Sequence, residues 1–157
     1  MLQSVDVKPD ITVWMPGLVR GKGRPRSRIM HKRDGSQFVH TYNPSETRHY
    51  EAELKFAAEQ AMKKLGAGKL FDEALRVRIT AMFAYPSSWS AKKRSNILHH
   101  ATKPDGDNIM KCVGDAFNKV VWFDDSRVSE WIIRKYYDDT PGLLVEVWRT
   151  WEGLREL

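Results

Sequence analysis

The segment from Leu75 to Tyr85, which reads LRVRITAMFAY, constrains the fold of this chain more than any other. Its apolar residues alternate with more polar ones, and this period of two is typical of a β-strand buried on one face. Pro86 ends the pattern, because proline cannot donate a hydrogen bond to a sheet. Such a strand must belong to a sheet whose apolar face is covered by another layer. The chain must therefore also supply covering elements.

Two amphipathic helices are predicted to form that layer. The first begins at Asn43-Pro44-Ser45-Glu46, where a capping residue, a proline and a glutamate make a helix-start signal. Its apolar residues recur at helical spacing as far as Leu65, and Gly66 is placed to end it. The second helix follows Asp107 and keeps the same spacing up to Val120. We interpret the apolar faces of both helices as core.

Three further strands complete the predicted sheet. The first is Ile11 to Met15, which a Pro-Gly pair stops. The other two, Val128 to Tyr137 and Leu143 to Trp148, are joined by a turn and indicate an antiparallel hairpin. The polar segment from Ser87 to Lys103 is either a mobile loop or a helical connection. We expect an α+β fold, a mixed sheet of four to five strands packed against two main helices, in a single domain spanning residues 1–157.

The charge balance favours a polyanionic partner. The chain has 26 Lys and Arg against 20 Asp and Glu, a formal net charge of +6, which makes nucleic acid the leading candidate. A basic, solvated surface without a partner explains the charge equally well. A single cysteine, Cys112, excludes an internal disulfide framework and a Cys-rich zinc site. No stretch has the roughly 20 apolar residues of a membrane span, so we expect a cytoplasmic protein without membrane contact.

Basic residues are concentrated between Arg20 and Arg33, a run without an acidic residue in which glycine and proline prevent a helix. We expect this run to be an exposed loop or arm. It either contacts DNA phosphates or is simply solvated. A second basic cluster lies in the polar segment after Pro86. The candidate DNA-binding residues of both clusters are Arg20, Lys22, Arg24, Arg26, Arg28, Lys92, Lys93 and Arg94.

Acidic residues gather at the two ends of the second predicted helix. Asp105-Gly106-Asp107 stands at its start, and Asp124-Asp125 follows it. Pro104 favours an extended chain at this point. Because residues i and i+2 of an extended chain project to the same side, we expect Asp105 and Asp107 to point together. The four carboxylates are then predicted to converge.

Each of these residues also has a purely structural interpretation. An Asp-x-Asp sequence before a helix is more often a cap than a catalytic site, so Asp107 alone indicates an N-cap. Asp124 and Asp125 can form a turn after a strand. Lys111, one helical turn after Asp107, can form an ordinary ion pair with Asp107 or Asp115. The combination, rather than any single residue, favours chemistry.

Converging carboxylates favour a metal site. Two ionised carboxylates about 4 Å apart repel each other by roughly 4 kcal/mol at an effective dielectric constant of about 20, and a divalent cation removes this repulsion. Mg²⁺ prefers carboxylate oxygens together with water and phosphate oxygens, and Mn²⁺ can substitute for it. Such a site suits phosphodiester hydrolysis. Lys111 would then place a positive charge beside the reacting phosphate.

These residues resemble the signature of the RusA family of Holliday junction resolvases, the crossover junction endodeoxyribonucleases. The similar segments are Lys103-Pro-Asp-Gly-Asp-Asn-Ile-Met-Lys111, Asp115-Ala-Phe117 and Trp122-Phe-Asp-Asp-Ser-Arg-Val128, with weaker similarity at Lys22 to Arg26 and at Tyr42 to Pro44. The resemblance implies that Asp105, Asp107 and Asp125 bind the metal and that Lys111 is the essential lysine. It leaves Asp124 as a further candidate ligand.

The resemblance also implies a function. A homodimer with two sites related by a two-fold axis matches a four-way DNA junction, whose opposed strands are cut symmetrically. We therefore expect a Mg²⁺-dependent endodeoxyribonuclease of DNA recombination and repair in the bacterial cytoplasm, with a phage or prophage origin left open. A structure-selective nuclease for other branched DNA and a non-catalytic DNA-binding protein are the alternatives.

Overall fold

A four-stranded sheet forms the centre of the molecule in the computed structural model, which describes residues 7–149. Its strands are β1 (Ile11–Pro16), β4 (Leu75–Phe83), β5 (Val128–Tyr137) and β6 (Gly142–Trp148), in the order β1-β6-β4-β5. β6 runs antiparallel to both of its neighbours, whereas β4 and β5 are parallel. The predicted α+β class with a mixed sheet is confirmed.

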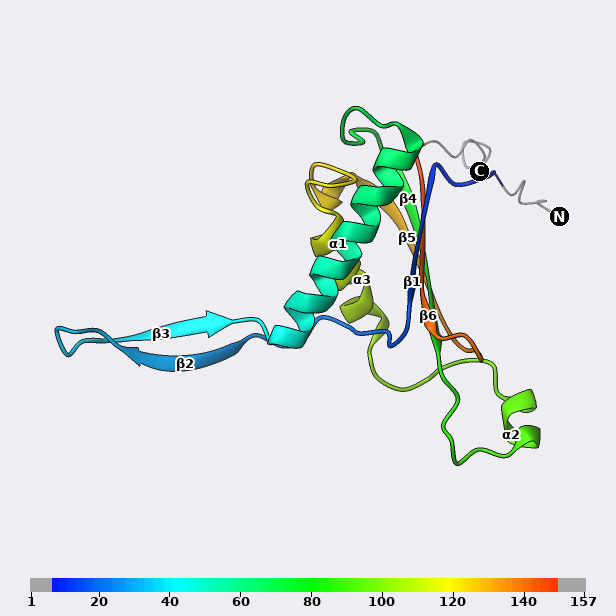
Figure 1. Cartoon of the computed structure of the whole chain (residues 1–157), viewed down its shortest axis with the longest axis horizontal. Coiled ribbons are helices and arrows are strands. Elements are labelled where there is room, and N and C mark those ends of the chain that lie inside the picture. The colour runs from blue at the N-terminus through cyan, green and yellow to red at the C-terminus, as the bar shows by residue number, and fades with distance from the viewer. Residues whose placement is uncertain (1–6, 150–157) are drawn as a thin grey trace.

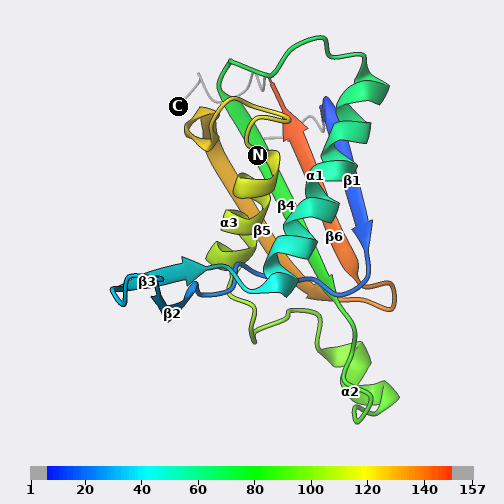
Figure 2. The same ribbon diagram turned by 60° about the vertical axis from the view of Figure 1, so that its left-hand side comes forward.

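Two helices, α1 (Ser45–Leu65) and α3 (Gly106–Phe117), cover one face of this sheet (Figures 1 and 2). The alternation in β4 is complete, because every second residue from Leu75 to Phe83 is buried. Leu54 of α1, Ile79 of β4 and Ile109 of α3 are all fully buried in the shared core. The apolar faces of both helices therefore serve as core, as their spacing predicts.

The predicted hairpin of the last two strands is wrong. β5 and β6 run in opposite directions and follow one another in the chain, but β4 lies between them. An alternating pattern reports which face of a strand is buried and carries no information about which strand is its neighbour. β5 occupies the edge of the sheet, and α3 packs beside it.

The helix boundaries differ slightly from expectation. α1 begins at Ser45, with Pro44 at the capping position, one residue later than the start signal indicates. Gly66 ends α1 in the left-handed conformation, with φ of 74°, as predicted. α3 begins at Gly106 and ends at Phe117, so Asp105 occupies its capping position and Val120 lies outside it.

The basic run forms part of an arm that projects from the sheet and helices (Figure 1). β2 (Arg26–His31) and β3 (Gln37–Tyr42) pair antiparallel as a two-stranded ribbon, and nearly all of its residues are exposed. Asp34 and Gly35 lie in the connecting turn, where Gly35 has φ of 83° and the Lys32 N–H donates to the Ser36 carbonyl. The predicted arm is confirmed, but its outer half is a strand rather than a loop.

The polar segment after β4 contains the short helix α2 (Ala91–Asn96), which Ser90 caps by accepting a hydrogen bond from the Lys93 N–H. The chain then pairs briefly with the edge strand, where the Tyr137 N–H donates to the Leu98 carbonyl. This segment is therefore a helical connection. Across the described part of the chain, no helix has the length and apolarity needed to cross a membrane.

Candidate active site

The acidic residues before and within α3 lie at the end of the helix nearest the arm and α2 (Figure 2). Asp105 stands at the capping position in an extended conformation but makes no side-chain capping hydrogen bond, and Asp107 lies in the first helical turn. The expectation that both residues belong to one extended stretch is wrong, because the helix has already begun at Gly106. Both carboxylates are exposed, which leaves their oxygens accessible to a ligand.

Lys111 forms an ion pair with Asp107. Its Nζ atom donates to Asp107 Oδ2 at 3.1 Å, across one turn of α3, and both side chains are more than half exposed. This hydrogen bond from Lys111 lowers the pKa of Asp107 below its ordinary value. Asp107 is thus not an N-cap, whereas the ion pair foreseen for Lys111 is present. An ionised carboxylate and an ammonium group meet at one accessible point.

Asp125 reaches α3 from the other end. It begins the short 3-10 helix η1 (Asp125–Arg127), just before β5, and a methyl group added at Gly114 would lie 3.3 Å from Asp125 Oδ2. The absence of a side chain at Gly114 therefore lets the carboxylate approach the helix. Gly114 follows Asp107 by seven residues, which places both on one face of α3, separated by about 10 Å along its axis.

Asp124 performs a local structural role. Its Oδ1 atom accepts a hydrogen bond from the Ser126 N–H at 3.0 Å and caps η1. Hydrogen bonds from the Ser126 side chain and backbone lower the pKa of Asp124. The turn that we predicted as the purely structural role of Asp124 is therefore present. The hydrogen bond that closes this turn also fixes the backbone of Asp125, the next residue.

A metal site at these residues stays a prediction. Between residues 7 and 149, no three His, Cys, Asp or Glu side chains lie close enough together to hold one ion. The donor chemistry nevertheless fits Mg²⁺, because Asp105 and Asp107 present exposed carboxylate oxygens and Asp125 presents another on the same face of α3. The predicted convergence of the four carboxylates is, however, not seen, because Asp125 meets α3 at Gly114, about 10 Å along the helix axis from Asp107.

Comparison with known proteins agrees with this chemistry. The sequence matches the family described as Endodeoxyribonuclease RusA over residues 16–148. The chain belongs to the RusA endodeoxyribonuclease family. It is also similar to a protein of Bacillus subtilis (strain 168) titled Uncharacterized protein YqaN, with 29% identity over 131 residues that cover 80% of this chain and 87% of that protein. The RusA match begins at the end of β1 and includes the arm, both helices and every acidic residue described above.

One basic residue of this RusA chain has its charge already paired. Lys22 Nζ contacts the carboxylate of Asp115 on α3 and lies 3.0 Å from Glu51 Oε1 on α1, an ion-pair contact without hydrogen-bond geometry. Burial, the largest influence, lowers the pKa of Lys22, but the contacts with Asp115 and Glu51 outweigh it and the pKa is raised. The sequence motif did not indicate this pairing. Lys22 therefore ties the root of the arm to both helices.

Replacing Lys22 with Met should lower the free energy of unfolding by about 1 to 3 kcal/mol, because Glu51 and Asp115 would lose their cationic partner. Urea denaturation followed by circular dichroism measures this loss. The exposed neighbour Arg24 is the matched control, and its replacement by Met should change stability by no more than about 0.5 kcal/mol. Equal effects at the two positions would contradict the assigned role of Lys22.

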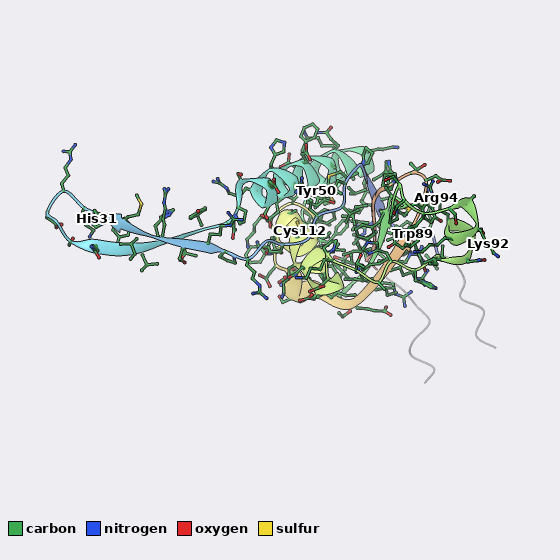
Figure 3. All side chains as sticks on the ribbon, turned by 90° about the horizontal axis from the view of Figure 1, so that it is seen from below. His31, Tyr50, Trp89, Lys92, Arg94 and Cys112 are labelled. Carbon is green, nitrogen blue, oxygen red and sulfur yellow. The ribbon has the colours of Figure 1, made fainter. Side chains whose placement is uncertain are left out.

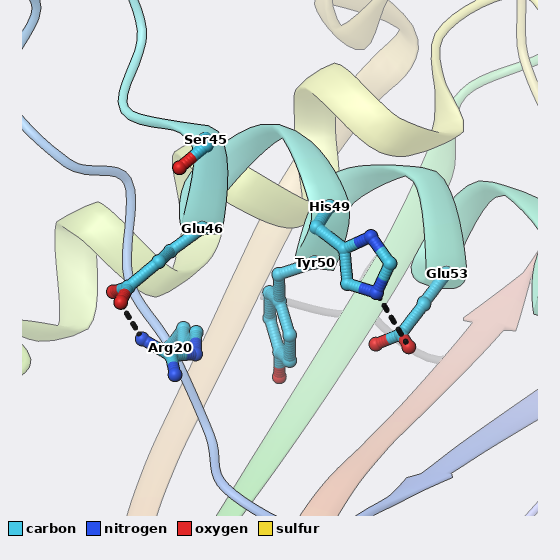
Figure 4. A pocket seen from close by; sticks show the side chains of 6 residues that line it. All are labelled: Arg20, Ser45, Glu46, His49, Tyr50 and Glu53. Carbon is cyan, nitrogen blue, oxygen red and sulfur yellow. Dashed lines mark hydrogen bonds and ion pairs between the residues drawn. The ribbon is translucent and has the colours of Figure 1, made fainter.

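Arg20 is also paired, at the edge of an open depression of about 390 Å³ beside the start of α1 (Figure 4). Its guanidinium donates to Glu46 at 2.7 Å, and His49 lies 3.4 Å from Glu53 on the same helix. The Tyr50 hydroxyl is buried nearby, and burial raises the pKa of Tyr50. Of the candidate DNA-binding residues, Arg20 and Lys22 thus form ion pairs within the protein. The others lie on the arm, at its root or on α2, where Arg94 Nε donates to the Trp89 carbonyl.

The basic residues of the arm and of α2 lie on opposite sides of the molecule. Figure 3 shows His31 on the arm at one end and Lys92 and Arg94 of α2 at the other, with Cys112 of α3 between them. Aromatic rings support the cations of α2, because Lys93 Nζ lies 4.4 Å from the centre of the Trp89 ring. Trp89 itself packs against Tyr137. Trp89 is therefore partly buried against the core and supports α2 from below its cations.

A depression of about 640 Å³ adjoins Asp107, between α3 and the edge strand β5. Its lining includes Asp107, Trp131 and the two adjacent histidines, His99 and His100. His100 is buried against Phe83, and burial, followed by the charge of Lys135, lowers the pKa of His100. His100 therefore forms part of the lining of the depression as a buried ring stacked on Phe83.

Proposed function

We propose that this chain is a Mg²⁺-dependent endonuclease that cuts the opposed strands of four-way DNA junctions in recombination and repair. One observation carries the proposal. A RusA-family sequence folds so that the ionised carboxylate of Asp107 and the ammonium of Lys111 meet, 3.1 Å apart, on an exposed face of α3. The face also receives the carboxylate of Asp125. A phosphodiester can approach this point from solvent.

In this proposal the acidic residues and the lysine have different roles. Asp105, Asp107 and Asp125 hold Mg²⁺, or Mn²⁺ in its place, through carboxylate oxygens, and Asp124 maintains the turn that presents Asp125. When bound, the ion polarises the scissile phosphate and makes an attacking water more acidic. Lys111 exchanges its contact with Asp107 for the phosphate and stabilises the negative charge that grows there during attack.

The basic surfaces define the path of the DNA in the proposal. The arm carries Arg26 and Arg28, and α2 carries Lys92, so cationic groups lie on both sides of the acidic start of α3. Phosphates held by these two surfaces would bring the strand between them to Asp107. Their attraction also offsets the repulsion that the acidic residues exert on DNA. Two copies related by a two-fold axis would place two such sites on one junction.

A cleavage assay on a synthetic four-way junction, with and without Mg²⁺, tests the proposal. We expect paired, symmetric cuts that require the metal. A panel of flaps, forks and linear duplexes decides the selectivity, since preferential cutting of flaps or forks would replace the junction by other branched DNA as the substrate. Tight binding without cutting at any metal concentration would contradict the nuclease. Sedimentation of the protein with the junction should give two copies per junction.

A further inference from the structure

The arm has two faces of different chemistry, and the register of its strands defines them. Arg28 pairs with His40, and the next pair along the ribbon is Ile29 with Val39. Because successive residues of a strand point to opposite sides, these two pairs lie on opposite faces. The first set, here called the cationic face, consists of Arg26, Arg28, Met30, Phe38, His40 and Tyr42. The second set, here called the β-branched face, consists of Ser27, Ile29, His31, Gln37, Val39 and Thr41.

Aromatic rings hold the charges of the cationic face in place. The Arg28 guanidinium lies 5.5 Å from the centre of the Tyr42 ring, and His40 stacks on the same ring at 5.9 Å. Beyond the end of β2, Lys32 Nζ lies 5.7 Å from the centre of the Phe38 ring, which places Lys32 on this face too. A cation over a ring loses fewer conformations when it meets a phosphate. The cationic face is therefore ordered before any ligand arrives.

The β-branched face has no lysine or arginine held over an aromatic ring. Ile29 and Val39 are 62% and 67% exposed, and Ser27 and Thr41 join their hydroxyl groups at 2.9 Å. The acidic residue of the arm, Asp34, lies in the turn and accepts hydrogen bonds from the Ser36 N–H and hydroxyl. Neither face of the described ribbon therefore carries an acidic side chain. The positive charge is concentrated on the cationic face.

The root of the arm is tied to the acidic end of α3. The Lys22 N–H donates to the Asn108 carbonyl at 2.8 Å, and a methyl group added at Gly21 would lie 3.0 Å from Asn108 and Pro104. Gly23 donates to the Thr47 hydroxyl of α1 at 3.2 Å. The direction in which the arm leaves the molecule is consequently fixed relative to Asp107. Whatever the arm holds is therefore positioned with respect to the candidate site.

We infer that the cationic face of the arm, and not its β-branched face, lies in a groove of a duplex that flanks the cleaved strand. The inference rests on the proposed function, because it takes DNA as the ligand. The major groove is about 12 Å wide and accepts a two-stranded ribbon. Arg28, Lys32 and His40 meet the phosphates along the groove, while Tyr42 and Phe38 support them from within the ribbon.

A pair of adjacent substitutions separates the two faces. His40→Glu and Val39→Glu place the same negative group on neighbouring exposed residues of β3 that point to opposite sides. Affinity for a four-way junction and for a linear duplex is measured by fluorescence anisotropy with EDTA, so that chemistry plays no part. At about 100 mM salt, His40→Glu should weaken binding of both DNAs by on the order of tenfold, and Val39→Glu by less than about twofold.

The salt dependence gives an independent measurement. Arg28→Ala should reduce the slope of the logarithm of the affinity against the logarithm of salt concentration by about 0.9, the value of one phosphate contact. Equal losses for the two glutamate variants, or none for either, would overturn the assignment of the face. Wild-type protein that binds junctions without cutting them in Mg²⁺ would contradict the proposed function while leaving this assignment intact. Thermal unfolding of each variant verifies that the fold is retained.

Discussion

Replacing Asp107 with Asn should reduce junction cleavage by at least about a hundredfold and leave junction binding intact. The amide keeps the size of the carboxylate but removes the negative charge that would bind a cation and that now pairs with Lys111. Loss of a group that only supports a metal ligand already costs 10- to 100-fold in many sites, so loss of a ligand should cost more. Single-turnover cleavage at saturating protein measures the rate separately from affinity.

Asp139→Asn is the control for this variant. Asp139 is also an exposed carboxylate, it lies in the turn between β5 and β6, and its substitution makes the same change in net charge. We expect wild-type cleavage from it. If Asp107→Asn cuts at the wild-type rate, Asp107 has no part in catalysis. Tighter binding of DNA by Asp107→Asn would be compatible with its role, because a negative charge has been removed beside the phosphates.

Replacing Trp122 with Ala should lower the free energy of unfolding by about 3 to 5 kcal/mol, the range for deleting a large buried aromatic side chain. Trp122 is fully buried, packs against the ring of Phe117 at 5.4 Å, and donates from its indole N–H to Asn118 Oδ1 at 2.8 Å. Its removal leaves a cavity and an amide oxygen without its donor. Urea denaturation measures the change.

The neighbouring residue supplies the matched control for the stability prediction. Phe123 is 58% exposed, so Phe123→Ala should cost less than about 1 kcal/mol. Trp122 also stands two residues before Asp124 in the chain, and for this reason Trp122→Ala should reduce cleavage at temperatures where the protein remains folded. Similar stabilities for the two variants would show that Trp122 does not anchor the segment.

The parts of the fold that the sequence predicted are those governed by burial within one element. The strict alternation of β4 and the Gly66 end of α1 follow from local rules, and both are present. The placement of β5 depends on a partner remote in sequence, and no local pattern encodes it. The ribbon of β2 and β3 was missed because neither face of an exposed arm is buried, so its apolar residues do not alternate regularly with polar ones. Its signal was the Asp34-Gly35 turn, which is typical of tight hairpins.

The candidate site likewise has contacts that local sequence rules predict and contacts that they do not. The contact of Lys111 with Asp107 follows from helical spacing, and the sequence identified that pair. The approach of Asp125 to Gly114 depends on how η1 packs, and the pairing of Lys22 with Asp115 joins residues 93 positions apart. Such contacts depend on the complete fold. The family match supports the chemistry, while the shared cation remains to be tested.

The connection between the parallel strands β4 and β5 has a consequence for folding. Every acidic residue of the candidate site, from Asp105 to Asp125, lies within this one connection. Strands that lie side by side but far apart in sequence pair late, because closing a long loop costs conformational entropy before any contact repays it. If the proposed function holds, newly made chains would gain a complete site only after this long connection has closed, which would keep partly folded molecules from nicking the DNA around them.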